Sequence, residues 1–285
     1  MVRVSVVIPC FNAGAWLREC VESVLAQDVP ETEVVIVDDG STDPGTADVL
    51  DEVAGDPAVR VIRGEHRDVS RARDFGFEQT SGRFVLFLDA DDKLGEGFLR
   101  ATVSALEGRP DCGVAFTDVR LFGAQTRTWR TGPLLFPGEI YLYNYLGIFS
   151  LVRRECVEAV GGFVPELVGF EDWDFWMKLE GIGVRFVKVR DAVAFYRKHP
   201  GSMVDTANEH WSELLHFMIL NHKPAYGRLF GYPISAREER RVRELLQASA
   251  DGSAPRARAR LQRTRLYRQF SLYSAVYRAC RRLLV

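Results

Sequence analysis

Three carboxylates within four positions are the residues of this sequence that most directly suggest chemistry. Asp89, Asp91 and Asp92 come at once after the apolar run from Phe84 to Leu88. Such a run is typical of a strand buried on both faces, and ligands of open α/β sheets collect beyond the carboxyl ends of the strands. Side chains two positions apart share a strand face, so Asp89 and Asp91 can face one hard cation, Mg2+ or Mn2+. An acidic turn that caps a helix is the alternative, and the run alone does not decide.

Polar side chains also follow two earlier apolar runs. Asn12 follows V-S-V-V-I at 4–8, and Asp38 and Asp39 follow V-V-I-V at 34–37. Carboxylates accept hydrogen bonds from ribose hydroxyls and from an imide N–H such as that of uracil, so this edge could hold a nucleoside whose diphosphate a metal neutralises. The alternative for 38–43 is turn formation and capping of the next helix.

Alternating strand and helix patterns place these residues. Predicted strands at 2–8, 34–37, 59–63 and 84–88 alternate with predicted helices at 15–26, 47–53 and 70–80. This order indicates βαβ units, and so an α/β fold with a mostly parallel sheet flanked by helices. Further patterns predict helices at 97–106, 171–180 and 207–220 and strands at 113–118 and 184–189. The simplest division is one α/β domain over 1–222 and a helical, basic extension over 223–285.

Composition narrows the class of protein. The 285 residues include five cysteines without close pairing, and the chain enters its first strand pattern without a charged-then-apolar leader, so we expect a reduced, cytoplasmic protein. No apolar stretch approaches the ~20 residues that span a bilayer. The turn after the first strand has one glycine where a dinucleotide fold needs three, and none of the five lysines is followed by Ser or Thr, which excludes dehydrogenases and P-loop NTPases.

The C-terminal segment is strongly basic, unlike the rest of the chain. Residues 255–285 contain nine arginines and no acidic residue, so the preceding 254 residues, with 28 basic and 39 acidic side chains, carry a formal −11. Leu266, Phe270, Tyr273 and Tyr277 are spaced by four, three and four positions, which predicts an amphipathic basic helix. This helix could lie on an anionic membrane surface, pack back on the acidic body or form a dimer contact. Nucleic acid is not an expected partner, because a body of −11 repels phosphate backbones.

Six motifs follow one another along the chain. They are V-S-V-V-I-P-C-F-N at 4–12, V-V-I-V-D-D-G-S-T-D at 34–43, S-R-A-R-D at 70–74, F-L-D-A-D-D at 87–92, G-G-F at 161–163 and E-D-W-D at 171–174. Together they resemble a family 2 glycosyltransferase with the GT-A fold. The resemblance covers residues 3 to about 200 and implies a metal-dependent, inverting transfer of a sugar from a nucleoside-diphosphate sugar, UDP-linked, to a hydroxyl acceptor. For a cytoplasmic enzyme with a basic amphipathic tail, we expect cell-surface glycan or lipid-linked saccharide synthesis, peripheral to the inner face of the membrane.

The same resemblance implies a role for individual residues. Asp172 would be the catalytic base, and Asp91 and His199 would meet the metal, Mg2+ or Mn2+. Asp74 stands where the family usually has Asn, which removes an amide donor near the phosphates. The implied nucleotide-sugar residues are Pro9, Phe11, Asn12, Asp38, Asp39, Arg71, Arg73, Asp89 and Ala90, and the implied acceptor residues are Gly162, Phe163, Glu171 and Trp173.

Plainer readings of these residues stay open. Glu171 and Asp172 could simply stabilise a helix N-terminus through its dipole, the glycines at 161–162 could form a plain turn, and His199 could be a loop residue. The aromatic residues within 117–150, Tyr141 and Tyr145 among them, could shape an acceptor site or belong to the core.

Two other functions compete with sugar transfer. One is a non-catalytic sugar-nucleotide-binding or scaffold protein on the same fold, against which the intact Asp89, Asp91 and Asp172 argue. The other is a nucleotidyltransferase, which normally has a Gly/Arg/Lys-rich phosphate loop that residues 10–14 do not provide. Donor sugar, acceptor and oligomeric state are not specified by the sequence.

Overall fold

The structure, a computed structural model, describes residues 3–27, 29–65, 67–131, 137–231, 233–250 and 256–284, without the side chains of 204–206 and 276–284. Val2 of the first predicted strand and the side chain of Tyr277 lie outside the described residues. The chain forms two compact units. The first unit comprises 1–133, 146–165 and 183–200, and the second comprises 134–145, 166–182 and 201–285. The predicted division at 222/223 stays a prediction.

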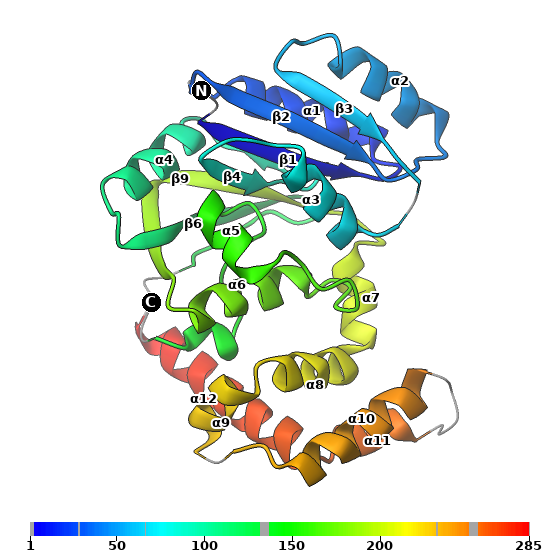
Figure 1. The fold of residues 1–285 in the computed structure, drawn as a ribbon, viewed down its shortest axis with the longest axis vertical. Helices are drawn as coiled ribbons and strands as arrows, with labels where there is room; N and C mark the ends of the chain where they lie inside the picture. The colour runs from blue at the N-terminus through cyan, green and yellow to red at the C-terminus, as the bar shows by residue number, and fades with distance from the viewer. Residues whose placement is uncertain are drawn as a thin grey trace. The chain divides into compact units, whose positions relative to one another are not determined.

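A mixed, mostly parallel sheet organises the first unit (Figure 1). Its described strands run in the order β3-β2-β1-β4-β8-β6-β9-β5, with β7 paired to β6. Parallel pairing joins β3, β2, β1 and β4 and also β6 with β9, whereas β8 is antiparallel to both β4 and β6. The predicted α/β class is therefore confirmed. The strands are β1 (Val4–Cys10), β2 (Thr32–Asp38), β3 (Val59–Arg63), β4 (Phe84–Phe87), β5 (Lys93–Leu94), β6 (Cys112–Gly123), β7 (Arg127–Trp129), β8 (Leu151–Arg153) and β9 (Arg185–Lys198).

The central strands are apolar throughout because both faces of the sheet are covered. Every residue of β1 and β4 is buried, which explains why their sequences lack polar alternation. Helix α3 packs on β1 and β2, and α4 packs on β6 and β9. The helices of this unit are α1 (Gly14–Leu25), α2 (Pro44–Val53), α3 (Val69–Glu78), α4 (Phe98–Glu107) and α5 (Arg154–Val160).

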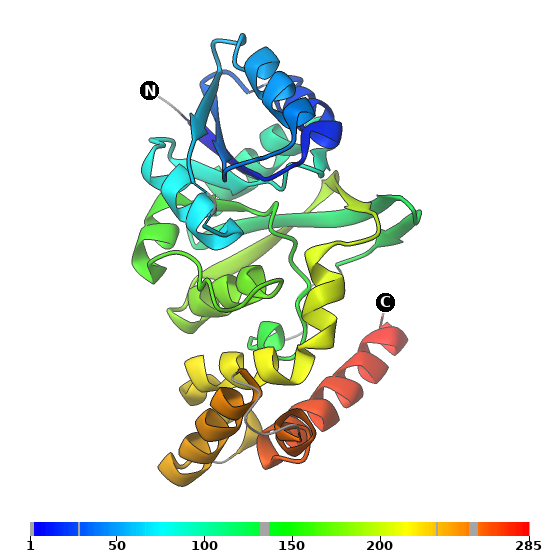
Figure 2. The same cartoon turned by 90° about the vertical axis from the view of Figure 1, so that its right-hand side faces the viewer.

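The second unit is helical over its described residues. Helices α10, α11 and α12 all contact α8, and Figure 2 shows these segments, coloured yellow to red, gathered together. The helix predicted at 207–220 is in fact two helices that meet at His210. The elements are η1 (Glu139–Tyr141), α6 (Glu171–Gly181), α7 (Met203–Glu209), α8 (Trp211–Asn221), α9 (Lys223–Phe230), α10 (Ala236–Ala250), α11 (Ala257–Leu261) and α12 (Arg265–Leu284).

The apolar face of the C-terminal helix is used inside this unit. Leu266 is 0% and Phe270 2% exposed, and the Phe270 ring lies 6.3 Å from the rings of Trp173 and Trp211. Tyr273 stacks on Phe230 at 5.8 Å. For these residues, packing back on the protein is the alternative that the structure bears out. None of the described helices has the length and apolar character needed to cross a membrane.

Two aromatic residues considered for the acceptor site belong to the core. Tyr141 is 7% and Tyr145 1% exposed. The Tyr141 hydroxyl donates to the carbonyl of Met177 at 3.0 Å, and burial raises the pKa of Tyr141 to about 12. Tyr141 thus holds η1 against α6 in the second unit.

Candidate functional site

The three carboxylates after β4 form one cluster. Ligand oxygens of Asp89, Asp91 and Asp92 all lie within 4.8 Å of one another. The turn that gathers them is closed by the Asp92 N–H, which donates to the carbonyl of Asp89 at 3.0 Å. The structure therefore brings the pair Asp89 and Asp91 together and places Asp92 beside it.

Asp92 is the buried member of this cluster, at 1% exposure. Its Oδ1 accepts the backbone N–H of Arg197 at 2.8 Å, whereas its Oδ2 is buried without a hydrogen-bond partner among the described residues. Burial, and then the charges of Asp91 and Asp89, raise the pKa of Asp92; burial and Asp89 likewise raise the pKa of Asp91. A buried carboxylate oxygen left unmatched is costly, and a divalent cation is the partner that such an oxygen donor set fits.

The end of β9 supplies the other side of the cluster. His199 Nε2 lies 3.0 Å from Asp91 Oδ2, and the imidazole stacks on Trp16 with centroids 4.5 Å apart. Arg197 Nε donates to the carbonyl of Asp91 at 2.8 Å, and the guanidinium pairs with Glu19. The predicted neighbours Asp91 and His199 are thus in contact. Arg197 was not singled out, although it stands two positions before His199 in the motif Y-R-K-H.

The two arginines of α3 have different environments. Arg73 is 1% exposed, pairs with Asp89 at 2.5 Å and lies 5.4 Å from the ring centroid of Phe163. Arg71 is exposed and pairs with Asp68 at 2.5 Å. The charge of Arg73 therefore orients Asp89, while Arg71 remains at the surface.

The loops after β1 and β2 are tied to each other. Asn12, with a φ of 51°, accepts the N–H groups of Thr42 and Asp43 on its Oδ1 at 2.8 and 3.0 Å. Asp38 accepts the N–H of Ser41 at 3.0 Å, which is the turn contact of the plainer reading.

The remaining predicted donor residues surround these loops. Asp39 accepts the N–H of Arg67 at 2.9 Å and, like Asp38, is buried. The ring of Phe11 is 45% exposed at this edge, whereas Pro9 and Ala90 are buried. An exposed aromatic ring beside buried carboxylates offers a flat apolar surface next to hydrogen-bond acceptors.

Asp74 has a structural task that the sequence did not suggest. It accepts the N–H of Phe163 at 3.2 Å, and a Cβ on Gly162 would lie 2.3 Å from its Oδ1. Gly162 also has a φ of +81°, a conformation that favours glycine. Phe163 is buried and packs edge-on against Phe87 at 4.9 Å. The replacement of Asn by Asp here keeps the acceptor oxygen that this contact needs.

Asp172 stands in the first turn of α6, in the second unit. Its Oδ1 accepts the N–H of Trp173 at 2.6 Å, and its Oδ2 accepts the side-chain amide of Asn144 at 3.3 Å. Asp172 is half-buried, whereas Glu171 and Trp173 are each 4% exposed. The Trp173 indole N–H donates to the carbonyl of Ile140 at 2.6 Å, so this ring belongs to the core of the unit. Asn144 lies in no motif and could not be found from the sequence.

Asp174 anchors the same helix from inside. It is fully buried, 2.8 Å from His222 Nε2 and 3.3 Å from Lys178 Nζ. Burial by itself would raise the pKa of Asp174, but the hydrogen bond and charge of His222, with the charge of Lys178, lower it below its ordinary value. The two aspartates of E-D-W-D thus differ in kind, one half-exposed and one paired in the core.

Comparisons with known proteins agree with this geometry. The family model "Glycosyl transferase family 2" matches residues 5–163. The chain is 38% identical over 231 residues, 75% of its length and 90% of the relative's, to "Putative teichuronic acid biosynthesis glycosyltransferase TuaG" of Bacillus subtilis (strain 168). It is 33% identical over 183 residues, 62% of its length, to "O-antigen biosynthesis protein RfbC" of Myxococcus xanthus, of which the match spans 14%. The chain thus covers a small part of some relatives and most of others.

Solved structures share the fold. The S. aureus TarS 1-349 structure in complex with UDP-GlcNAc superposes with a TM-score of 0.65 at 20% identity, over 99% of this chain and 92% of that one. The structure "Mannosyltransferase PcManGT from Pyrobaculum calidifontis in complex with GDP-Man and Mn2+" superposes with a TM-score of 0.60 at 21% identity, over 96% of this chain and 84% of that one.

Proposed function

Since the chain belongs to glycosyl transferase family 2 and has the GT-A fold, we propose that this glycosyltransferase moves a sugar from a UDP-linked donor to an acceptor hydroxyl with inversion. Membership of a glycosyltransferase family argues against both rival functions, a non-catalytic sugar-nucleotide-binding protein and a nucleotidyltransferase. UDP as the nucleotide is supported by the buried acceptors Asp38 and Asp39, which suit an imide N–H and ribose hydroxyls.

One observation carries the proposal: the cluster of Asp89, Asp91 and Asp92, whose buried Asp92 Oδ2 lacks a hydrogen-bond partner among the described residues. We propose that Asp91, with His199 beside it, holds Mg2+ or Mn2+ there. The donor set of carboxylate oxygens with one imidazole fits Mn2+, and carboxylates alone fit Mg2+. When bound, the ion would neutralise charge that develops on the departing diphosphate.

The protein's own residues would do the rest. Phe11 would offer its exposed ring to the base, Asp39 and Asp89 would accept ribose hydroxyls, and Arg71 would approach the phosphates. Asp172 would accept the proton of the acceptor hydroxyl while that oxygen attacks the anomeric carbon. A single displacement inverts this centre and needs no second carboxylate as nucleophile, unlike retaining glycosidases.

The acceptor class is proposed from the relatives. The names of TuaG and RfbC refer to teichuronic acid and O-antigen biosynthesis, which supports a saccharide acceptor of the cell surface, free or lipid-linked. We further propose that Gly162, Phe163, Glu171 and Trp173 shape the acceptor side by fixing the backbone, since three of them have buried side chains and the fourth is a glycine. A cytoplasmic enzyme that associates with the inner face of the membrane through 255–285 would meet such an acceptor.

The test is a panel of UDP, GDP and dTDP sugars, assayed with and without Mn2+. We expect thermal stabilisation by UDP that depends on Mn2+, and release of UDP on turnover. Asp172→Asn should abolish turnover and keep Mn2+-dependent UDP binding, while Asp48→Asn on the exposed face of α2 should change neither. Release of pyrophosphate, or full turnover by the Asp172 variant, would refute the proposal.

A further inference from the structure

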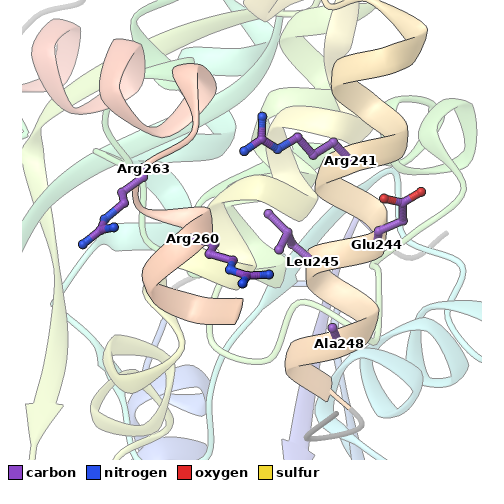
Figure 3. Close-up of a pocket in the computed structure, with 6 residues that line it drawn as sticks. All are labelled: Arg241, Glu244, Leu245, Ala248, Arg260 and Arg263. Atoms are coloured by element: carbon purple, nitrogen blue, oxygen red, sulfur yellow. The ribbon is translucent and has the colours of Figure 1, made fainter. Parts of the chain in front are cut away.

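A hollow in the second unit is unrelated to the residues discussed so far. It lies between α10 and the segment from α11 to the start of α12, with a volume of about 510 Å³ (Figure 3). Its lining combines arginines with apolar side chains. The lining residues are Arg241, Glu244, Leu245, Ala248, Arg260 and Arg263.

The arginines of this hollow are not neutralised by the described part of the chain. Arg241, Arg260 and Arg263 have no ion pair with a described carboxylate, whereas their neighbours Arg243 and Arg258 pair with Glu239 and Glu213. Three arginines without a described ion pair therefore line one hollow, together with a single carboxylate, that of Glu244.

Figure 3 shows how the lining side chains are arranged. The Arg260 side chain extends toward Leu245, the Arg241 side chain extends from α10 toward the opposite segment, and the Arg263 side chain and the carboxylate of Glu244 point away from Leu245. Guanidinium groups that enter one hollow from two helices suit a phosphate group, which each can bind through two parallel N–H bonds.

We infer that this hollow binds the phosphate group of an anionic membrane lipid. Leu245 and Ala248 give the site an apolar side. Free phosphate has no apolar group to pack there, whereas the glycerol and the first methylenes of a lipid can bury apolar surface against these side chains. The segment 255–285 has nine arginines and no acidic residue, a charge that would attract this unit to an anionic surface. Because Leu266 and Phe270 are already buried, association rests on phosphate contacts rather than on insertion of the α12 apolar face.

The inference extends the membrane association proposed above and requires neither donor nor metal. Flotation of the full chain with vesicles tests it, comparing phosphatidylcholine alone with an equal mixture of phosphatidylcholine and phosphatidylglycerol. We expect binding only to the mixed vesicles. The double variant Arg241→Ala/Arg260→Ala should lower the partition coefficient about 25-fold, or about fivefold for each arginine.

A matched control separates a site from general attraction. Arg237→Ala/Arg240→Ala removes the same charge from exposed positions of α10 outside the hollow. General attraction alone would give both double variants the same loss, so we expect a smaller loss in the control than in the hollow variant. Equal losses in the two double variants would overturn the inference. So would competition by free glycerol phosphate at the concentration of lipid phosphate. Unchanged UDP binding in both variants would separate this result from a failure of the donor site.

Discussion

Replacing the buried carboxylate of the acidic cluster should stabilise the protein without metal and weaken its response to metal. In Asp92→Asn, the side-chain oxygen can still accept the N–H of Arg197, while the new amide can donate to the neighbouring carboxylates. Two like charges 4.8 Å apart repel by about 3.5 kcal/mol at an effective dielectric constant of about 20. Arg73 and His199 offset part of this repulsion, so we expect a net gain of about 2 kcal/mol, or about 4–8 °C in Tm.

Thermal unfolding with and without Mn2+ measures both effects. The wild-type protein should gain about 2.7 kcal/mol when Mn2+ is at about 100 times its Kd, and Asp92→Asn should gain much less. Asp48→Asn makes the same chemical change on an exposed helix face and should stay within about 0.5 kcal/mol of wild type in both conditions. A lower metal-free Tm in Asp92→Asn, with the Mn2+ shift of the wild type, would refute the electrostatic reasoning, because it would mean that Asp92 acts only as a hydrogen-bond acceptor.

Three further predictions concern stability. Since the pKa of Asp174 is lowered by His222 and Lys178 against the effect of burial, its ionised form contributes stability above the unfolded value of about 3.9 and loses it as pH falls through the lower folded value. The Tm difference between wild type and Asp174→Asn should therefore be full at pH 6 and shrink below about pH 4, and a constant difference would contradict this. Gly162→Ala should lower the free energy of unfolding by about 2–3 kcal/mol, because Gly162 has a positive φ and the new Cβ would overlap Asp74. Gly161→Ala is the control, since Gly161 has a φ of +72° and no atom within 4 Å of the new Cβ, and it should lower this free energy by about 1 kcal/mol. Equal losses of Tm in the two variants would show that the overlap with Asp74 has no effect. Phe270→Ala should lower the free energy of unfolding by about 3–5 kcal/mol in denaturant unfolding, whereas Leu272→Ala, at 61% exposure, should be nearly neutral. Equally small losses in both variants would mean that α12 is bound less firmly than its contacts indicate.

The sequence predicted best where local pattern and burial agree. The strand at 59–63 and the helix at 15–26 match β3 and α1 to within a residue or so, because continuous apolar runs and 3.6-residue periodicity are local signals. The predicted strands at 113–118 and 184–189 are shorter than β6 and β9, whose later residues alternate with charged side chains. Those later halves pair with each other across more than 70 positions, a contact that no local pattern reports.

The residues whose contacts could not be predicted from the sequence have partners far along the chain. Asp74 stands where the family usually has Asn, which suggested the loss of an amide donor near the phosphates, and its contact is the N–H of Phe163, 89 positions away. Tyr141 and Tyr145 could not be assigned to core or acceptor site from their type alone, since aromatic rings serve both. The break at His210 is equally non-local, because the neighbouring α8 packs against the C-terminal helices α11 and α12.

The acidic cluster shows why its residue types were predictable and its geometry was not. The apolar strand β4 fixes where Asp89 and Asp91 stand, but three carboxylates in one turn repel one another and would separate if nothing held them. Arg73 from α3 and Arg197 and His199 from β9 are the groups that hold them, and the last two lie more than 100 positions from their partners. These contacts engage one oxygen of each of the three carboxylates and leave Asp92 Oδ2 buried without a partner among the described residues. Folding of β9 onto the sheet therefore assembles an oxygen donor set whose remaining repulsion a bound cation can relieve, so we expect metal affinity to fall when Arg197 is truncated even though its side chain is no ligand.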